Sequence, residues 1–299
     1  KDIADLPPPC AKMMFKPHGV NVSWSGERHL GAVIGTEEFR QEYVSTKVQQ
    51  WVDSVQELST IAVNEPQLAY SNYVKGLSHK WTYLQRTIPG VAELFQPLED
   101  AIRASLLPAL LGKPINDTER QILALPVRLG GMGIPDPTTT ADREYRCSAA
   151  ITKQHVEVIL SQNTSLSAIN RSVINNIKLQ LKNEKQIGLQ KTLEQIKETV
   201  SPKTKRCLEL AAEKGASSWL TALPLQRLGY CLNKQEFRNA VAVRYDWAIT
   251  EMPSFCACGK KNSVDHALSC KKGGYPILRH NAIRDAEAMI MKEAGCVDV

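Results

Sequence analysis

The sequence predicts a mainly α-helical protein with a short β-hairpin near its N-terminus and a small metal-binding knuckle near its C-terminus. Three observations lead to this prediction. From residue 36 onward, apolar residues recur every three or four positions over most of the chain, which is the period of an amphipathic helix. Residues 18–35 instead alternate in polarity and carry four glycines, as a hairpin does. Finally, three cysteines and one histidine fall within fifteen residues near the C-terminal end.

The hairpin and the first helix meet at Thr36. We expect the hairpin to turn near Ser25 and Gly26, because a small polar residue followed by glycine favours a tight turn. Thr36 is a suitable N-cap, because its hydroxyl can accept a hydrogen bond from a free backbone N–H of the first helical turn. Apolar residues from Phe39 to Ile61 then give the helix one buried face.

Caps and breaks predict the helices that follow. Pro66 suits the first turn of a second helix, where its missing N–H costs nothing, and Pro89 ends that helix. Asn116 and Glu119 have the spacing of a capping box for a short helix, which the glycine- and proline-rich turn LPVRLGGMGIPDP follows. Further helices are expected over about 91–111, 138–162 and 166–200.

Composition excludes several classes of protein. The 299 residues are 43% hydrophobic and 23% charged, which is enough apolar material for a core and is typical of neither disordered nor fibrous chains. No apolar run approaches the roughly 20 residues of a membrane span, and no cationic, apolar leader opens the chain. We therefore expect a nuclear or cytoplasmic protein that is not secreted and does not bind membranes. The chain begins at Lys1 and ends shortly after a helical pattern, so we also expect a piece of a larger protein.

The cysteine and histidine cluster has the spacing of a metal site. Cys256, Cys258, His266 and Cys270 form the pattern C-x-C-x7-H-x3-C. Gly259 can turn the first pair into a tight knuckle, and residues 266 and 270 would lie side by side on one helical face. Four protein ligands make a closed structural zinc site with no position for a catalytic water. The alternatives are a chance cluster and a catalytic Cys–His pair, which would not need three cysteines.

Positive charge is concentrated around this cluster. Residues 256–284 contain six Lys and Arg against a single Asp, within a chain of net charge +6. Such a local excess indicates a polyanionic partner, although a merely solvated face is the alternative. The candidate nucleic-acid contacts are Lys260, Lys261, Lys271, Lys272, Arg279, His280 and Arg284.

Three stretches resemble a known family. They are HKWTYLQRTIPGVAELFQPLEDAIRASLLPALLG, LALPVRLGGMGIPDPTTTADREY, and the knuckle followed directly by KKGGYPILRHNAIRD. Together they resemble the C-terminal part of non-LTR (LINE-type) retrotransposon proteins. The branch in question is the one in which reverse transcriptase is followed by a Cys-Cys-His-Cys knuckle and a restriction-endonuclease-like domain.

The resemblance implies a division of the chain and a role for the hairpin. Residues Arg28, His29, Leu30 and Gly31 would belong to a primer-grip-like hairpin. The partners would be an RNA template and target DNA, as in target-primed reverse transcription, and a small-molecule substrate is not expected. The implied parts are the end of a polymerase palm (1–35), a thumb-like helical domain (36–135), a helical linker (136–250), the zinc knuckle (254–274) and the first helix of an endonuclease-like domain (275–299).

Neither catalytic centre of that family is present. The palm's paired aspartates would precede residue 1, and no Asp-Asp pair occurs in the chain. The nuclease carboxylates would lie beyond Val299. Magnesium would therefore be a cofactor only of the full-length parent protein, and no catalytic residue is assigned, so we expect neither polymerase nor nuclease activity from these residues alone.

Two other functions remain open from the residues. One is a stand-alone zinc-containing nucleic-acid-binding protein derived from such an element. The other is a helical interaction protein that zinc merely stabilises, which the clustered charge disfavours.

Overall fold

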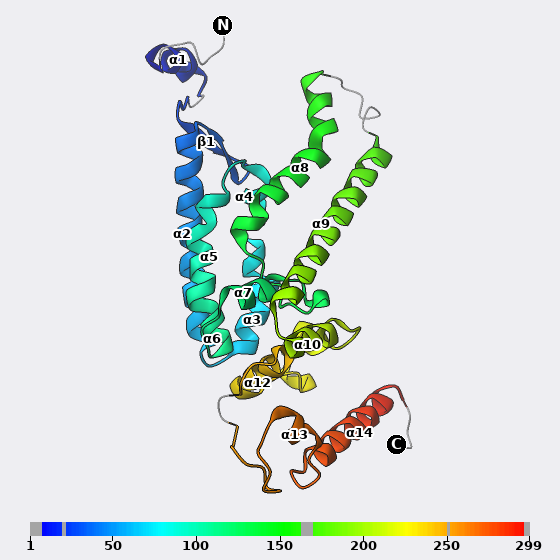
Figure 1. Ribbon diagram of the computed structural model, residues 1–299. Coiled ribbons are helices and arrows are strands. Elements are labelled where there is room, and N and C mark those ends of the chain that lie inside the picture. The colour runs from blue at the N-terminus through cyan, green and yellow to red at the C-terminus, as the bar shows by residue number, and fades with distance from the viewer. Residues whose placement is uncertain (1–7, 20–21, 163–169, 250–251, 296–299) are drawn as a thin grey trace. The chain divides into compact units, whose positions relative to one another are not determined.

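The structure is a computed structural model, and it describes residues 8–19, 22–162, 170–249 and 252–295. The described residues are mainly α-helical, as predicted, with a two-stranded antiparallel sheet (Figure 1). Parts of the expected palm end (1–7 and 20–21), of the expected helical linker with its helix over 166–200 (163–169 and 250) and of the last helical segment (296–299) lie outside the described residues. The elements are α1 (Pro8–Phe15), β1 (Gly26–His29), β2 (Ala32–Gly35), α2 (Glu37–Ala62), α3 (Pro66–Lys75), α4 (Thr82–Thr87), α5 (Gln96–Ala101), α6 (Leu107–Leu111), α7 (Asp117–Ala124), α8 (Pro137–Leu160), α9 (Arg171–Thr199), α10 (Pro202–Ala212), α11 (Ser218–Thr221), α12 (Lys234–Tyr245), α13 (Val264–Ser269) and α14 (Tyr275–Glu293).

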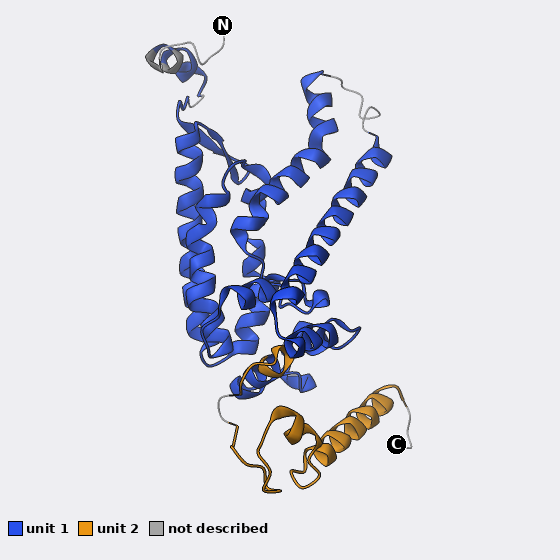
Figure 2. Ribbon diagram, in the orientation of Figure 1, with its two compact units in different colours: residues 1–241 blue, residues 242–299 orange. Residues whose placement is uncertain are grey.

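The chain divides into two compact units. Unit 1 comprises residues 1–241 and unit 2 comprises residues 242–299 (Figure 2). Unit 1 contains the hairpin and the long helices, whereas unit 2 contains the cysteine cluster with α13 and α14.

Helix α2 supplies one wall of the core of unit 1. Thr36 caps it as predicted, because its hydroxyl oxygen accepts a hydrogen bond from the backbone N–H of Phe39. Its buried face packs against α3, α5 and α6. Aromatic rings fill the space beside it: the Trp51 ring centroid lies 6.0 Å from that of Trp81 and 6.2 Å from that of Phe95. Trp81 is therefore a core residue, and Trp51, which is half-buried, packs against it.

Two of the expected helices are interrupted. The expected second helix divides into α3 and α4, with Gly76 at the end of α3 and a short 3-10 turn after it. The expected third helix begins with a 3-10 turn and contains a π-turn over Ile102–Leu106. Pro108 lies just after this π-turn, in the first turn of α6. Because proline has no N–H to donate to a regular helical hydrogen bond, the helix is already irregular at this point, which is compatible with the wider turn before it.

A buried ion pair holds the glycine-rich turn against the core. The capping box of Asn116 and Glu119 starts α7 as predicted. On α7, the Arg120 guanidinium donates to both carboxylate oxygens of Glu99 at 2.6 Å and to the backbone oxygen of Ile134 at 2.8 Å. Both side chains of the pair are more than nine-tenths buried. Because a buried charge needs full pairing, this contact fixes where the chain returns after the turn.

Helix α12, which begins in unit 1, forms hydrogen bonds to α6 through Arg238, and the segment before it contacts α3. Arg238 of α12 donates to the backbone oxygens of Ala109 at 2.6 Å and Leu110 at 3.2 Å, at the end of α6. The Gln67 side chain of α3 donates to the oxygen of Tyr230 and accepts from the N–H of Leu232. Segments more than 120 positions apart are thereby joined.

The hairpin turns at a different place from the one expected. β1 and β2 pair in antiparallel register with Gly26 opposite Gly35, so the turn lies at Leu30 and Gly31 rather than at Ser25 and Gly26. Gly26 instead lets its backbone lie close to the Phe39 ring and to the partner strand, because a Cβ there would lie 2.4 Å from the ring and 2.7 Å from the Ile34 oxygen. The expected turn position was wrong because a glycine can serve either purpose.

Candidate metal centre and its basic surroundings

A tight loop presents the first two cysteines. Phe255 and Lys261 form an antiparallel bridge, and the backbone N–H of Cys256 donates to the oxygen of Lys260. At the tip, Gly259 has φ +84°, which is a left-handed conformation that glycine adopts without cost. Its N–H donates to the oxygen of Cys256 at 2.8 Å. The loop is therefore closed by backbone hydrogen bonds that do not depend on the thiols.

A short helix presents the other two candidate ligands. The Ser263 side chain caps α13, accepting from the N–H of His266 at 3.1 Å. The last N–H of the helix, that of Cys270, donates to the oxygen of His266 at 2.8 Å. This places residues 266 and 270 one helical turn apart on the same face, as the spacing predicts.

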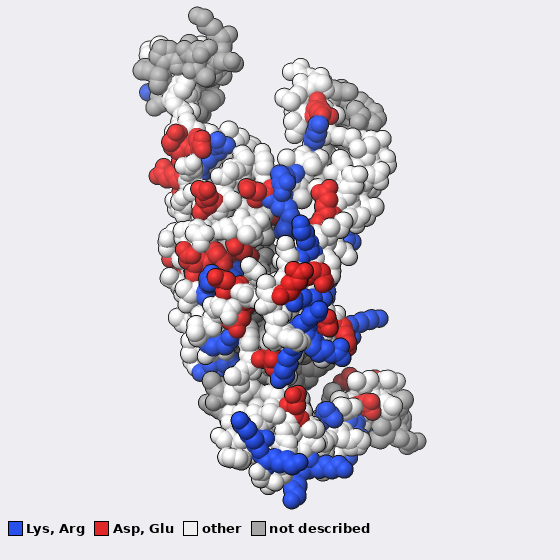
Figure 3. Space-filling view, viewed as in Figure 1, with Lys and Arg blue, Asp and Glu red and all other residues white. Residues whose placement is uncertain are grey.

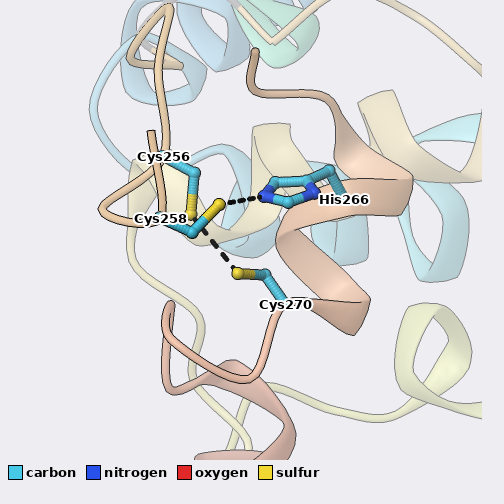
Figure 4. Close-up of side chains that lie close together, drawn as sticks. All are labelled: Cys256, Cys258, His266 and Cys270. Atoms are coloured by element: carbon cyan, nitrogen blue, oxygen red, sulfur yellow. Dashed lines mark hydrogen bonds between the residues drawn. The ribbon is translucent and has the colours of Figure 1, made fainter. Parts of the chain in front are cut away.

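The four side chains converge on one point. All four candidate ligand atoms lie within 4.8 Å of one another (Figure 4). The Sγ atoms of Cys256 and Cys270 are 3.6 Å apart, and the Sγ of Cys258 lies 3.2 Å from Nε2 of His266. A tetrahedral zinc ion with ordinary bond lengths would separate two sulfurs by about 3.8 Å and a sulfur from a nitrogen by about 3.6 Å. The cluster could thus hold a metal such as zinc with small side-chain adjustments.

The environment acts differently on the thiols. The backbone N–H of Gly273 is the main cause of a lowered pKa at Cys270, which is itself buried. At Cys256 the backbone N–H of Cys258 lowers the pKa, but burial and the neighbouring thiols together outweigh it and the net pKa is raised. Backbone N–H donors thus already face two of the sulfurs, and such donors favour the thiolate form that a metal binds.

The predicted cations surround the cluster on exposed positions. Lys260 and Lys261 lie on the loop, while Lys271 and Lys272 follow α13 directly. Gly274, at φ +78°, then starts α14. That helix carries the three remaining exposed candidates, which are Arg279, His280 and Arg284.

One of these cations already has a partner. The guanidinium of Arg284 forms an ion pair with Asp285 at 2.6 Å, with both side chains largely exposed. An exposed pair of this kind is worth little, so the guanidinium can exchange its carboxylate for a phosphate at small cost.

The residues expected to form a primer-grip-like hairpin belong to unit 1 and are not part of this cluster. Arg28, His29 and Leu30 are exposed, and no metal-binding group includes them among the described residues. Leu30 has φ +49°, a backbone conformation that is strained for a bulky side chain, and it is 83% exposed. Tyr83 and Tyr43 donate to the turn oxygens of Leu30 at 2.7 Å and Gly31 at 3.3 Å.

Sequence reasoning missed two features of these regions. The tyrosines that hold the hairpin turn lie 12 and 53 positions away from it, and nothing in their spacing signals the contact. In unit 2, the few apolar residues of the knuckle line an open hollow of about 390 Å³, which includes Phe255, Val264, Leu268 and Tyr275. Their scarcity was visible in the sequence, but their common location was not.

Comparisons with known proteins found no match, whether with family models, curated proteins or solved structures. Among the described residues, no helix has the length and apolar character needed to cross a membrane.

Proposed function

We propose that Cys256, Cys258, His266 and Cys270 bind one zinc ion as a closed structural site. Three thiolates and one imidazole are ligands that zinc prefers, and the four ligand atoms lie within 4.8 Å of one another. With four protein ligands, no position remains for a substrate or a reactive water. The role of the ion is then to hold the loop and α13 together.

We further propose that unit 2 binds nucleic acid through the cations around this site. The observation that carries the proposal is the exposure of six Lys and Arg side chains within residues 256–284, against one Asp. A metal-ordered knuckle keeps several of them close together, so one polyanion can meet them at the same time. No pair of these residues matches a base-reading arrangement, so binding should depend little on sequence.

For the whole chain, we propose a C-terminal fragment of a non-LTR retrotransposon reverse transcriptase/endonuclease that acts on RNA template and target DNA. The sequence resemblance supports this assignment, including the knuckle followed by a helix that starts YPILRHNAIRD. In the full-length parent, magnesium and the catalytic carboxylates would come from outside these residues. A stand-alone nucleic-acid-binding protein with the same knuckle is the second candidate, and the same exposed cations support it.

Metal analysis tests the zinc site. Purified protein should contain one zinc per chain, and Cys258→Ser or His266→Ala should lose it. Cys231→Ser is the matched control, because Cys231 is exposed and outside the cluster. Full zinc content in the Cys258→Ser/His266→Ala double variant would disprove the assignment.

Salt-titrated binding tests the nucleic-acid surface. In the patch variant, Lys271, Lys272, Arg279 and Arg284 become Gln. If three or four phosphates are contacted, the slope of log affinity against log salt should become less steep by about 3 to 4 in this variant. The surface control variant removes the same charge from exposed positions elsewhere, at Lys80, Lys191, Lys214 and Arg227, and should bind as wild type does. Equal slopes for the patch and control variants would contradict the proposal and favour a helical interaction protein.

A further inference from the structure

Helix α9 carries a basic stripe on one face. We use this name for Arg171, Lys178, Lys182 and Lys185, which follow one another at spacings of seven, four and three residues. At 3.6 residues per turn, these spacings keep the four side chains within about 60° of the helix circumference. With a rise of 1.5 Å per residue, the row is about 21 Å long. The stripe is therefore nearly straight and parallel to the helix axis.

The cations of the basic stripe are free to bind. All four are exposed, and none forms an ion pair with another side chain in the part of the chain that the structure describes. The acidic residues of α9, which are Glu184, Glu194 and Glu198, lie on the opposite side of the helix by the same geometry. Figure 3 shows one face of the molecule, on which Lys and Arg side chains are interspersed with acidic ones.

The far end of the helix is firmly held. Ile174 is buried near the start of α9, and at its far end Leu193 and Ile196 are buried where α9 packs against α7 and α8. Leu193 and Ile196 share the angular sector of the basic stripe. Helix α9 is thus anchored mainly through its C-terminal part, and the four exposed cations of the stripe lie along its N-terminal half, on the same side. A stripe on an anchored helix loses little freedom on binding.

We propose that the basic stripe binds the phosphate backbone of a nucleic-acid duplex, independently of the cations in unit 2. A single strand of a duplex carries one phosphate per 3.4 Å of axis, so a 21 Å row of four cations lies opposite about six phosphates. A duplex is also stiff over this length, which matches a straight, rigid row better than a flexible strand does. Because the opposite side of α9 is acidic, the helix lies along the backbone rather than deep in a groove, where its carboxylates would meet phosphates.

This inference goes beyond the proposed function because it assigns a second contact surface, in unit 1. The proposed contact also predicts that binding does not depend on the base sequence. Contacts to phosphates alone carry no sequence information, so unrelated duplexes of equal length should bind equally.

The experiment combines two sets of substitutions. The stripe variant changes Arg171, Lys178, Lys182 and Lys185 to Gln, which has a similar helix propensity, so the circular dichroism of α9 should be kept. It is compared with wild type, the patch variant, the combination of both, and the surface control variant. The probes are a 20-base-pair DNA duplex, the corresponding RNA duplex and one single strand, each over a range of salt concentrations.

The expected result is a duplex salt slope that becomes less steep by about 3 to 4 in the stripe variant, with or without the patch substitutions. A stripe variant that binds duplexes as the surface control does would overturn the inference, whatever the patch variant shows. Loss of single-strand binding with unchanged duplex binding would also overturn it. If only the patch variant has a changed duplex salt slope, the proposed function stands and this inference is wrong. If only the stripe variant has a changed slope, this inference stands and the proposed nucleic-acid surface of unit 2 is wrong.

Discussion

Tyr73 buries a hydroxyl for which the described residues offer no hydrogen-bond partner. Its side chain is fully buried beside the Trp81 ring, and its Oη is without a partner among the described residues. Burial is the main cause that raises the pKa of Tyr73 far above its usual value of about 10. The folded state therefore requires the neutral phenol. Ionisation of Tyr73 therefore does not affect the free energy of unfolding below about pH 10. Above that pH the unfolded chain ionises more readily than the folded protein, so the free energy of unfolding falls as the pH rises toward the folded-state pKa.

Tyr73→Phe should therefore stabilise the protein. Removing an unpaired buried hydroxyl should raise the free energy of unfolding by about 1 kcal/mol at pH 7, and the loss of stability between pH 9 and 11 should become smaller. Tyr70→Phe is the control with opposite sign, because the Tyr70 hydroxyl donates to the Met132 oxygen at 2.7 Å. Urea unfolding across this pH range measures both. A destabilised Tyr73→Phe protein would show that the hydroxyl is paired after all.

Two glycines should respond in opposite ways to alanine. A Cβ at Gly131 would lie 1.9 Å from the backbone oxygen of Leu125, so Gly131→Ala must displace the turn after α7 and should cost about 3 kcal/mol or more. Gly188 lies within α9 with open space around it, so Gly188→Ala should add about 0.5–1 kcal/mol. Thermal unfolding of both variants checks the sign of each change.

At the scale of elements, the hairpin turn stores backbone strain. Leu30 adopts a left-handed conformation that costs a leucine about 1–2 kcal/mol, and its side chain is too exposed to recover this by packing. Leu30→Gly should therefore raise hairpin stability by about 0.5–1 kcal/mol, after the greater freedom of glycine in the unfolded chain is subtracted. Tyr83→Phe, which removes the hydrogen bond to this turn, should lower it. Amide hydrogen exchange in β1 and β2 provides the measurement, and faster exchange in Leu30→Gly would contradict the prediction.

Elements with short-range signals were predictable, and those with long-range causes were not. The caps Thr36 and Asn116 and the cysteine spacing act over a few residues, so the sequence alone indicates them. The Glu99–Arg120 pair joins residues 21 positions apart and has no local pattern. Likewise, Gly26 and Gly31 look equally suited to a turn until strand pairing decides between them.

At the scale of the whole molecule, the two units should respond differently to metal removal. None of the described residues of α14 is fully buried, and the knuckle has few large apolar residues, so apolar burial alone does not order these parts of unit 2. Metal ligation can supply on the order of 10 kcal/mol in such modules. A strong chelator should therefore increase hydrogen exchange over 254–274 and leave the exchange of α2 to α7 unchanged. Simultaneous loss of protection in both regions would show that the units depend on one another.

The contacts of Arg238 have a consequence for how the protein is synthesised. The carbonyls at the end of α6 are bound by a side chain that leaves the ribosome 128 positions after Leu110. At ordinary rates of translation that is roughly 6 to 26 s, during which α3 and α6 lack the helix that covers them. Nascent chains of this length are targets for chaperones. Polypeptides that stop between residues 135 and 230 should accordingly be recovered as aggregates, whereas those that continue through α12 should be recovered folded.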